Sequence, residues 1–170
     1  MQILCRWLLR GKKGRISAIL IVEKSRLSLI REETMRIAVI DGQGGGIGRA
    51  IIERIRELTG KEHELLALGT NAYATANMMK AGADMGASGD NAIAHNAKTA
   101  DIIMGPVAIL SANSLLGEIS PTIACAVGDS PAAKILIPLN KCNLYIAGLK
   151  PEPLPVLIDA AVELLRTLER

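Results

Sequence analysis

The sequence predicts an α/β fold, a Rossmann-like three-layer sandwich in which helices cover both faces of a mostly parallel sheet. Short apolar runs alternate with segments of helical spacing along residues 35–170. One junction between such a run and a helix holds five glycines within seven positions. Hydrophobic residues make up 49% of the chain but aromatic residues only 2%, so aliphatic side chains must form the core, as suits a sheet covered by helices.

The glycine-rich segment, residues 42–48, lies between the first predicted strand and the first predicted helix. Residues 37–40 are an apolar run of strand length, and Ile51, Ile55 and Leu58 follow at helical spacing. Glycine lets a backbone approach a ligand closely, and the N-terminus of a helix stabilises an anion. We therefore predict that a phosphate group binds to these residues: Asp41, Gly42, Gln43, Gly44, Gly45, Gly46, Ile47 and Gly48.

The spacing of these glycines limits the kind of site. The G-x-G-x-x-G pattern of dinucleotide folds fails because position 49 is an arginine, and no G-K-[ST] sequence closes the segment as in a P-loop. Gly42, Gly46 and Gly48 instead fit G-x-x-x-G-x-G. The alternative interpretation is a tight turn between strand and helix that binds no ligand.

The second predicted strand, residues 65–68, ends at a Gly-Thr-Asn sequence. Dinucleotide folds place an acidic residue near this point to bind the adenosine ribose, or an arginine to bind a 2′-phosphate. This chain has neither there, and Thr70 and Asn71 offer only neutral hydrogen bonds. The absence argues against ordinary NAD binding, and Asn71 is equally suited to capping the next helix.

The remaining elements follow the same alternation. We predict helices over residues 72–80, 90–97, 107–116, 120–127 and 156–168, strands over 101–104 and 132–139, an edge strand over 144–149, and either a short strand or a loop over 83–89. The helix over 107–116 has no charge, so we expect it either under the sheet or in the interface of a homo-oligomer. A monomer by light scattering would mean that this segment is simply core.

The carboxyl ends of parallel strands meet at one edge of a sheet, where ligands bind. The predicted ligand site therefore also includes Thr70, Asn71, Gly105, Pro106 and Asn140.

Cys142, Lys141 and Asp41 are the candidate catalytic residues. The ammonium group of Lys141 favours the thiolate of Cys142, although a small buried filler is the alternative role for this cysteine.

Charge and composition exclude several classes of function. The whole chain carries a net charge of +3 and residues 1–34 carry +5, which leaves −2 on residues 35–170. With few aromatic residues and no basic stripe there, we predict no nucleic-acid partner. Three cysteines and two histidines show no zinc-ligand spacing, so we predict no metal, and the sparse cysteines favour a cytoplasmic location.

Residues 1–34 are predicted to be an extension outside the folded domain of residues 35–170. Their apolar run, residues 16–22, is too short to span a bilayer and no cleavage site follows it, so we predict no membrane association. Residues 31–33 can be encoded by a purine-rich run resembling a bacterial ribosome-binding site, one codon before Met35. The extension is therefore either disordered or lies upstream of a translation start at Met35, which the intact mass of the native protein tests.

From Met35 onward the chain resembles a family of small bacterial proteins of unknown function. The resemblance rests on I-D-G-Q-G-G-G-I-G, A-L-G-T-N-A, I-I-M-G-P, L-G-E-I and I-L-I-P-L-N-K-C-N. It implies a Rossmann-like fold and no established activity. The glycine-rich segment also resembles the cofactor loop of short-chain dehydrogenases, with Asp41 in place of their usual threonine. Their catalytic Y-x-x-x-K is missing, because Asn77 follows Tyr73 and Leu149 follows Tyr145 at the lysine position.

Three functions remain open at this point. The first is a nucleotide-binding protein whose ligand is NAD(P) or another phosphate-bearing nucleotide, with an NAD(P)-linked oxidoreductase as its enzymatic form. The second is a non-catalytic nucleotide sensor or accessory subunit that acts through an interface. The third, a phosphosugar-type enzyme, keeps the anion site without the dinucleotide.

Overall fold

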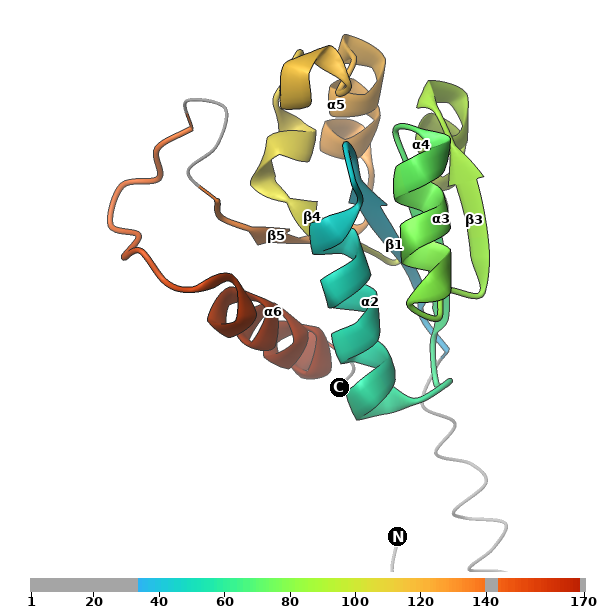
Figure 1. The fold of residues 1–170 in the computed structure, drawn as a ribbon, viewed down its shortest axis with the longest axis vertical. Helices are drawn as coiled ribbons and strands as arrows, with labels where there is room; N and C mark the ends of the chain where they lie inside the picture. Colours follow the sequence, from blue (N-terminus) through green and yellow to red (C-terminus); the bar gives the residue numbers. More distant parts are fainter. Residues whose placement is uncertain (1–33, 140–143, 169–170) are drawn as a thin grey trace, which may run out of the picture. The chain divides into compact units, whose positions relative to one another are not determined.

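The computed structural model describes residues 34–139 and 144–168, which form an α/β domain (Figure 1). The strands are β1 (Arg36–Asp41), β2 (Glu64–Gly69), β3 (Met85–Ser88), β4 (Ile102–Pro106) and β5 (Ala133–Ile137). The helices are α2 (Gly46–Thr59), α3 (Ala72–Lys80), α4 (Asp90–Asn96), α5 (Pro121–Asp129) and α6 (Leu154–Leu168), with 3₁₀ turns η1 (Val107–Leu110) and η2 (Leu115–Gly117).

The five strands form one sheet in the order β3-β2-β1-β4-β5, and every neighbouring pair is parallel. This confirms the predicted Rossmann-like sheet. The chain order reverses at β1, which pairs with β2 on one side and with β4 on the other. Open parallel sheets bind ligands at such a reversal, beyond the carboxyl ends of the strands.

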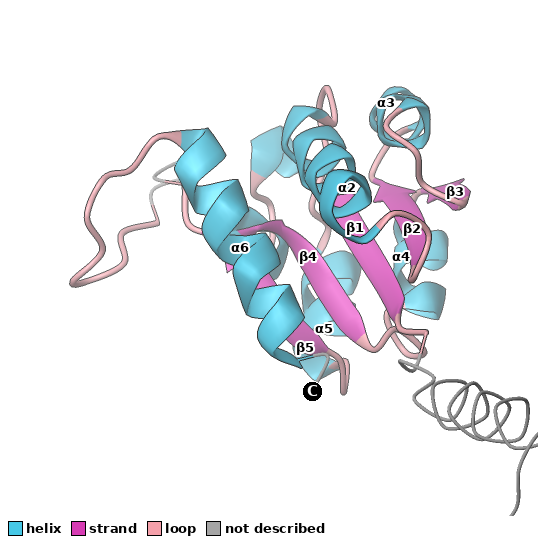
Figure 2. Cartoon of the chain, turned by 90° about the horizontal axis from the view of Figure 1, so that it is seen from below, coloured by secondary structure: helices cyan, strands magenta, loops and turns pink. Residues whose placement is uncertain are grey.

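Alternate residues of the strands feed two separate cores. In β1, Ile37 and Val39 face one core with helices α2, α3 and α6, whereas Ala38 and Ile40 face the other with α4, α5 and the turns η1 and η2. Figure 2 shows α2, α3 and α6 on one face of the sheet and α4 and α5 on the opposite face. All four β1 residues are completely buried, as expected for a central strand covered on both sides.

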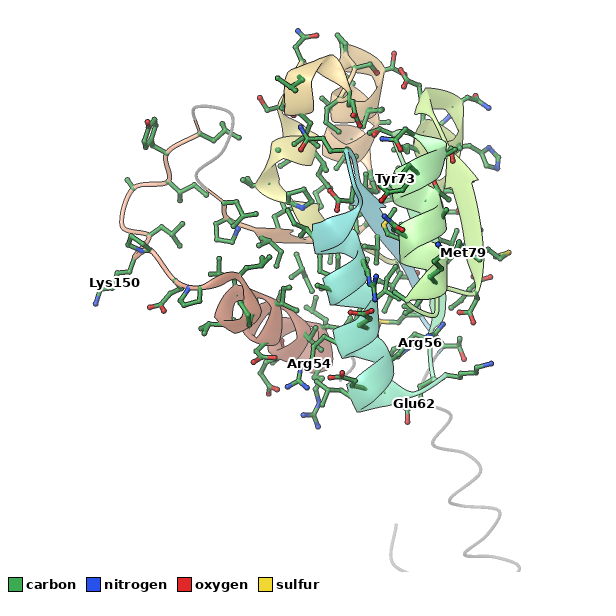
Figure 3. All side chains as sticks on the ribbon, viewed as in Figure 1. Arg54, Arg56, Glu62, Tyr73, Met79 and Lys150 are labelled. Atoms are coloured by element: carbon green, nitrogen blue, oxygen red, sulfur yellow. The ribbon has the colours of Figure 1, made fainter. Side chains whose placement is uncertain are left out.

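Arg56 of α2 contacts the turns that lead into β2 and β3, at the edge of the sheet opposite the carboxyl ends of the strands (Figure 3). Its guanidinium donates to the carbonyl oxygens of Gly82 at 2.8 Å, Gly60 at 2.9 Å and His63 at 3.1 Å. It also forms an ion pair with Asp84 at 2.5 Å. One side chain therefore supplies partners for the ends of two helices and the starts of two strands.

The structure corrects the predicted helix over residues 107–116. This segment forms the separate turns η1 and η2, because Asn113, Leu115 and Leu116 have positive φ angles that an α-helix cannot contain. Ile109 and Leu115 are already buried in the core. The homo-oligomer therefore stays a prediction that rests on two exposed leucines, Leu110 and Leu116.

Two shorter segments were also ambiguous or wrong in the sequence-based prediction. Residues 144–149 form no strand, so the predicted edge strand there is wrong. Residues 85–88 are a strand, β3, which settles the choice between strand and loop. No helix of residues 34–139 and 144–168 is long and apolar enough to cross a membrane.

Candidate functional site

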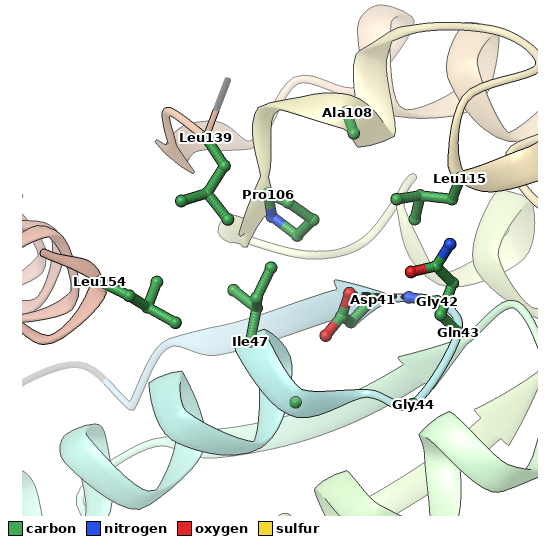
Figure 4. Close-up of a pocket in the computed structure, with 11 residues that line it drawn as sticks. Asp41, Gly42, Gln43, Gly44, Ile47, Pro106, Ala108, Leu115, Leu139 and Leu154 are labelled. Atoms are coloured by element: carbon green, nitrogen blue, oxygen red, sulfur yellow. Dashed lines mark hydrogen bonds between the residues drawn. The ribbon is translucent and has the colours of Figure 1, made fainter. Parts of the chain in front are cut away.

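A cavity of about 340 Å³ opens at the carboxyl ends of β1 and β4, where the strand order reverses (Figure 4). Its floor is the glycine-rich segment, and its walls come from the end of β4 and the turns after it, the chain after β5 and the start of α6. The residues that line it are Asp41, Gly42, Gln43, Gly44, Gly46, Ile47, Pro106, Ala108, Leu115, Leu139 and Leu154. The lining is mostly apolar, with polar backbone on one side, as is usual for small-molecule sites.

The glycine-rich segment is held in one conformation by its own backbone and by α3. Gly45 donates its N–H to the carbonyl oxygen of Gly42 at 2.9 Å. Asn77 of α3 donates to the carbonyl oxygen of Gly44 at 2.8 Å, and Asn71 donates to that of Gln43 at 3.1 Å. The segment is therefore a preformed turn.

Asp41, the last residue of β1, is buried under this turn and shapes it. One of its carboxylate oxygens accepts from the N–H of Gly42 and the other from the N–H of Gly48, both at 2.8 Å. Burial raises the pKa of Asp41, even though the N–H groups of Gly48, Gly42 and Ile47 act in the opposite direction. This carboxylate consequently uses backbone donors that a phosphate would otherwise need.

The glycines of the segment divide into two groups. A Cβ atom at Gly42, Gly45 or Gly48 would lie closer than 3.0 Å to neighbouring atoms, and Gly45 also has a φ of 67°. At Gly45 these atoms belong to the Ala74 backbone and at Gly48 to Met78 and Asp41, so the fold itself requires glycine at both positions, whereas at Gly42 they are the side-chain ends of Thr70 and Glu118. At Gly44 a Cβ atom would make only an ordinary contact with Tyr73, and at Gly46 it would meet nothing within 4 Å.

The backbone N–H groups of Gly44 and Gly46 also differ from those of Gly42, Gly45 and Gly48, which all have hydrogen-bond acceptors. Neither has a hydrogen-bond partner within residues 34–139 and 144–168. Gly46 is the first residue of α2, so its N–H points out of the positive end of a 14-residue helix. Two donors that line the cavity are thus left for a group from outside the described chain.

Glu118, which the sequence analysis did not single out, lies beside the same turn. Its Oε2 atom accepts from the N–H of Gln43 at 2.7 Å, from the amide of Asn71 at 3.0 Å and from the hydroxyl of Thr70. Burial alone would raise the pKa of Glu118, but these hydrogen bonds outweigh it and lower the pKa. Glu118 is the sole charged residue of the sequence between Asp101 and Asp129, a signal that could have identified it.

The remaining predicted site residues do not all lie at the cavity. Pro106 lines the cavity, whereas Gly105 lies against the Ile40 carbonyl of β1 and serves strand packing. The predictions for Asn140, Lys141 and Cys142 fall outside the described residues. Asn71 caps α3 by accepting from the N–H of Ala74 at 2.9 Å, in addition to its contacts with the turn. No three His, Cys, Asp or Glu side chains within residues 34–139 and 144–168 come together as metal ligands.

The raised pKa of Asp41 predicts how stability depends on pH. The native state binds the Asp41 proton more tightly than the unfolded state, so this group contributes stability at low pH that is lost as pH rises through the raised pKa. Asp41→Asn should flatten that part of the profile, measured as the free energy of unfolding in urea from about pH 4 to pH 7. Asp129→Asn, at an exposed aspartate, is the control and should leave the profile unchanged. An Asp41→Asn profile parallel to that of the wild type contradicts the assignment.

Comparison with known proteins places the domain in a family. A comparison with curated proteins gave no match. The family described as a domain of unknown function (DUF3842) matches residues 36–170, which include every strand and helix found in residues 34–139 and 144–168. The chain therefore belongs to the DUF3842 family of proteins of unknown function.

Proposed function

We propose that the protein binds a phosphate-bearing nucleotide at the carboxyl edge of the sheet. A phosphate oxygen accepts from the N–H groups of Gly44 and Gly46, at the positive end of α2. The base or another flat group lies in the cavity against Ile47, Pro106 and Leu139. A volume of about 340 Å³ is within the range of small-molecule sites.

The properties of Gly46 are the main support for a phosphate site. No neighbour lies within 4 Å of a Cβ atom at this position, and its φ angle is not in the left-handed region, so the fold does not demand glycine there. Its N–H has no partner in the described part of the chain, and it lines the cavity. A ligand that approaches the backbone closely accounts for all three properties.

The direct test is binding to the purified full-length chain. Isothermal titration calorimetry with NAD⁺, NADP⁺, AMP and inorganic phosphate should give saturable heat for at least one nucleotide. Mass spectrometry of small molecules released from freshly purified protein identifies a ligand that co-purifies. The absence of binding by every nucleotide, with none released, contradicts the proposal.

A non-catalytic sensor or accessory subunit is the second candidate. Among the described residues that line the cavity, Asp41 alone has a titratable side chain, and both its oxygens already accept backbone N–H groups. General acid–base chemistry needs a group that can exchange a proton with the substrate. Hydride transfer to or from bound nicotinamide can be measured as a change in nicotinamide absorbance when a panel of alcohols and aldehydes is added. Such a transfer would favour the oxidoreductase over the sensor. A nucleotide that binds without turnover favours the sensor.

A further inference from the structure

We propose that Glu118 is the residue that selects a nucleotide with a free ribose 2′,3′-diol, and therefore NAD(H) over NADP(H). This inference rests on the proposed nucleotide site and names the class of ligand for it. Dinucleotide folds bind the adenosine ribose with an acidic residue at the end of the second strand, where this sequence has Thr70 and Asn71. The structure supplies a carboxylate at that place from a distant part of the chain.

The position of the Glu118 carboxylate is fixed by groups that follow two neighbouring strands, β1 and β2. Gln43 belongs to the turn after β1, and Thr70 and Asn71 follow directly after β2. All three donate to Oε2. Glu118 itself comes from the segment after β4, so 47 or more residues separate it from these two side-chain donors.

Oε1, the second carboxylate oxygen of Glu118, is the atom that would accept the ribose hydroxyls. It accepts no hydrogen bond from residues 34–139 and 144–168, although the side chain is only half-exposed. A fixed, ionised carboxylate with one oxygen unused is an acceptor for hydroxyl donors. The two hydroxyls of a ribose are such donors, whereas a 2′-phosphate brings negative charge next to negative charge.

Neighbouring groups support the same selection. The donors to Glu118 within residues 34–139 and 144–168 are neutral, and no lysine or arginine of these residues is among its hydrogen-bond partners, so none of these partners compensates the charge of a ligand phosphate. The free N–H groups of Gly44 and Gly46 lie further along the same turn, on the side of the cavity. A dinucleotide with its ribose at Glu118 can therefore place its phosphates at Gly44 and Gly46 and its second base in the cavity.

The test compares NAD⁺ with NADP⁺ by calorimetry on the full-length wild type and on Glu118→Gln, which keeps the size of the side chain and removes its charge. The wild type should bind NAD⁺ at least about 10-fold more tightly than NADP⁺. In Glu118→Gln the ratio of the NADP⁺ dissociation constant to the NAD⁺ dissociation constant should fall and approach one. Glu62→Gln, at an exposed glutamate next to the start of β2, is the matched control and should keep the wild-type ratio.

Thr70→Val gives a second measurement, because it removes one donor that positions Glu118 and keeps the charge. Thr70→Val should weaken NAD⁺ binding and lower the ratio of the NADP⁺ to the NAD⁺ dissociation constant. A purely structural role of Thr70 would instead weaken the binding of both ligands equally. Equal binding of NAD⁺ and NADP⁺ by the wild type, or an unchanged ratio in Glu118→Gln, overturns the role of Glu118 while the nucleotide site stands. If no nucleotide binds at all, the proposed function fails and this inference fails with it.

Discussion

Gly46→Val is expected to abolish nucleotide binding while the domain stays folded. Position 46 lies in the first turn of α2, and a Cβ atom there meets nothing within 4 Å, so we expect the variant to fold. Gly46 lines the cavity, so an added side chain is expected to lie where the ligand must approach the backbone. We expect the dissociation constant to rise by about 100-fold or more, which corresponds to roughly 2.7 kcal/mol.

The control for this variant is another glycine that has open space around it. Gly128 lies in α5, and a Cβ atom there also meets nothing within 4 Å. Gly46→Ala and Gly128→Ala should both keep or slightly raise the free energy of unfolding, by up to about 1 kcal/mol. Only the change at position 46 should weaken binding in calorimetry. Wild-type affinity in folded Gly46→Val would refute the phosphate site.

Gly105→Ala is expected to destabilise the whole domain. A Cβ atom at Gly105 in β4 would lie closer than 3.0 Å to the carbonyl oxygen of Ile40 in β1, and near Ile109 on the same face. Both strands are central and covered by helices, so neither backbone can move without disturbing a core. Overpacking against backbone should lower the free energy of unfolding by about 3 kcal/mol, and Tm by roughly 10 °C.

Thermal and urea unfolding measure this effect, with Gly128→Ala again as the comparison. Marginal stability makes a loss of this size easy to observe, because a domain has only about 5–15 kcal/mol in total. A Gly105→Ala protein that unfolds at the wild-type urea concentration would mean that β1 and β4 do not approach each other as closely as the structure shows.

The sheet and most helices could be predicted from sequence because their side-chain patterns are strong. Apolar runs such as residues 37–40 and 65–68 are hydrophobic on both faces, which only a strand between two helix layers requires. The segment over residues 107–116 misled the prediction because it is apolar and uncharged without helical periodicity. Its conformation is set instead by positive φ angles at Asn113, Leu115 and Leu116, which sequence patterns do not reveal for non-glycine residues.

The candidate site was only partly predictable for a different reason. The glycine pattern located the turn, but it could not separate Gly46 from Gly48, since that distinction depends on a tertiary neighbour, Met78 of α3. Glu118 was missed because its partners Thr70 and Asn71 lie far away in sequence. Spacing rules find acids that are close to a motif in the chain, and this one is close only in space.

The cluster of contacts made by Arg56 has a consequence for how the protein can change over evolution. The turns at Gly60, Gly82 and Asp84 are cross-linked to one guanidinium, so an insertion there would remove charged and backbone partners together. At the opposite edge of the sheet, the carboxylate of Glu118 joins the turn after β1 to the residues after β2 in a comparable way, through Gln43, Thr70 and Asn71. Each edge therefore depends on one charged side chain that several turns share. Changes in loop length should be tolerated best in loops that contact neither Arg56 nor Glu118.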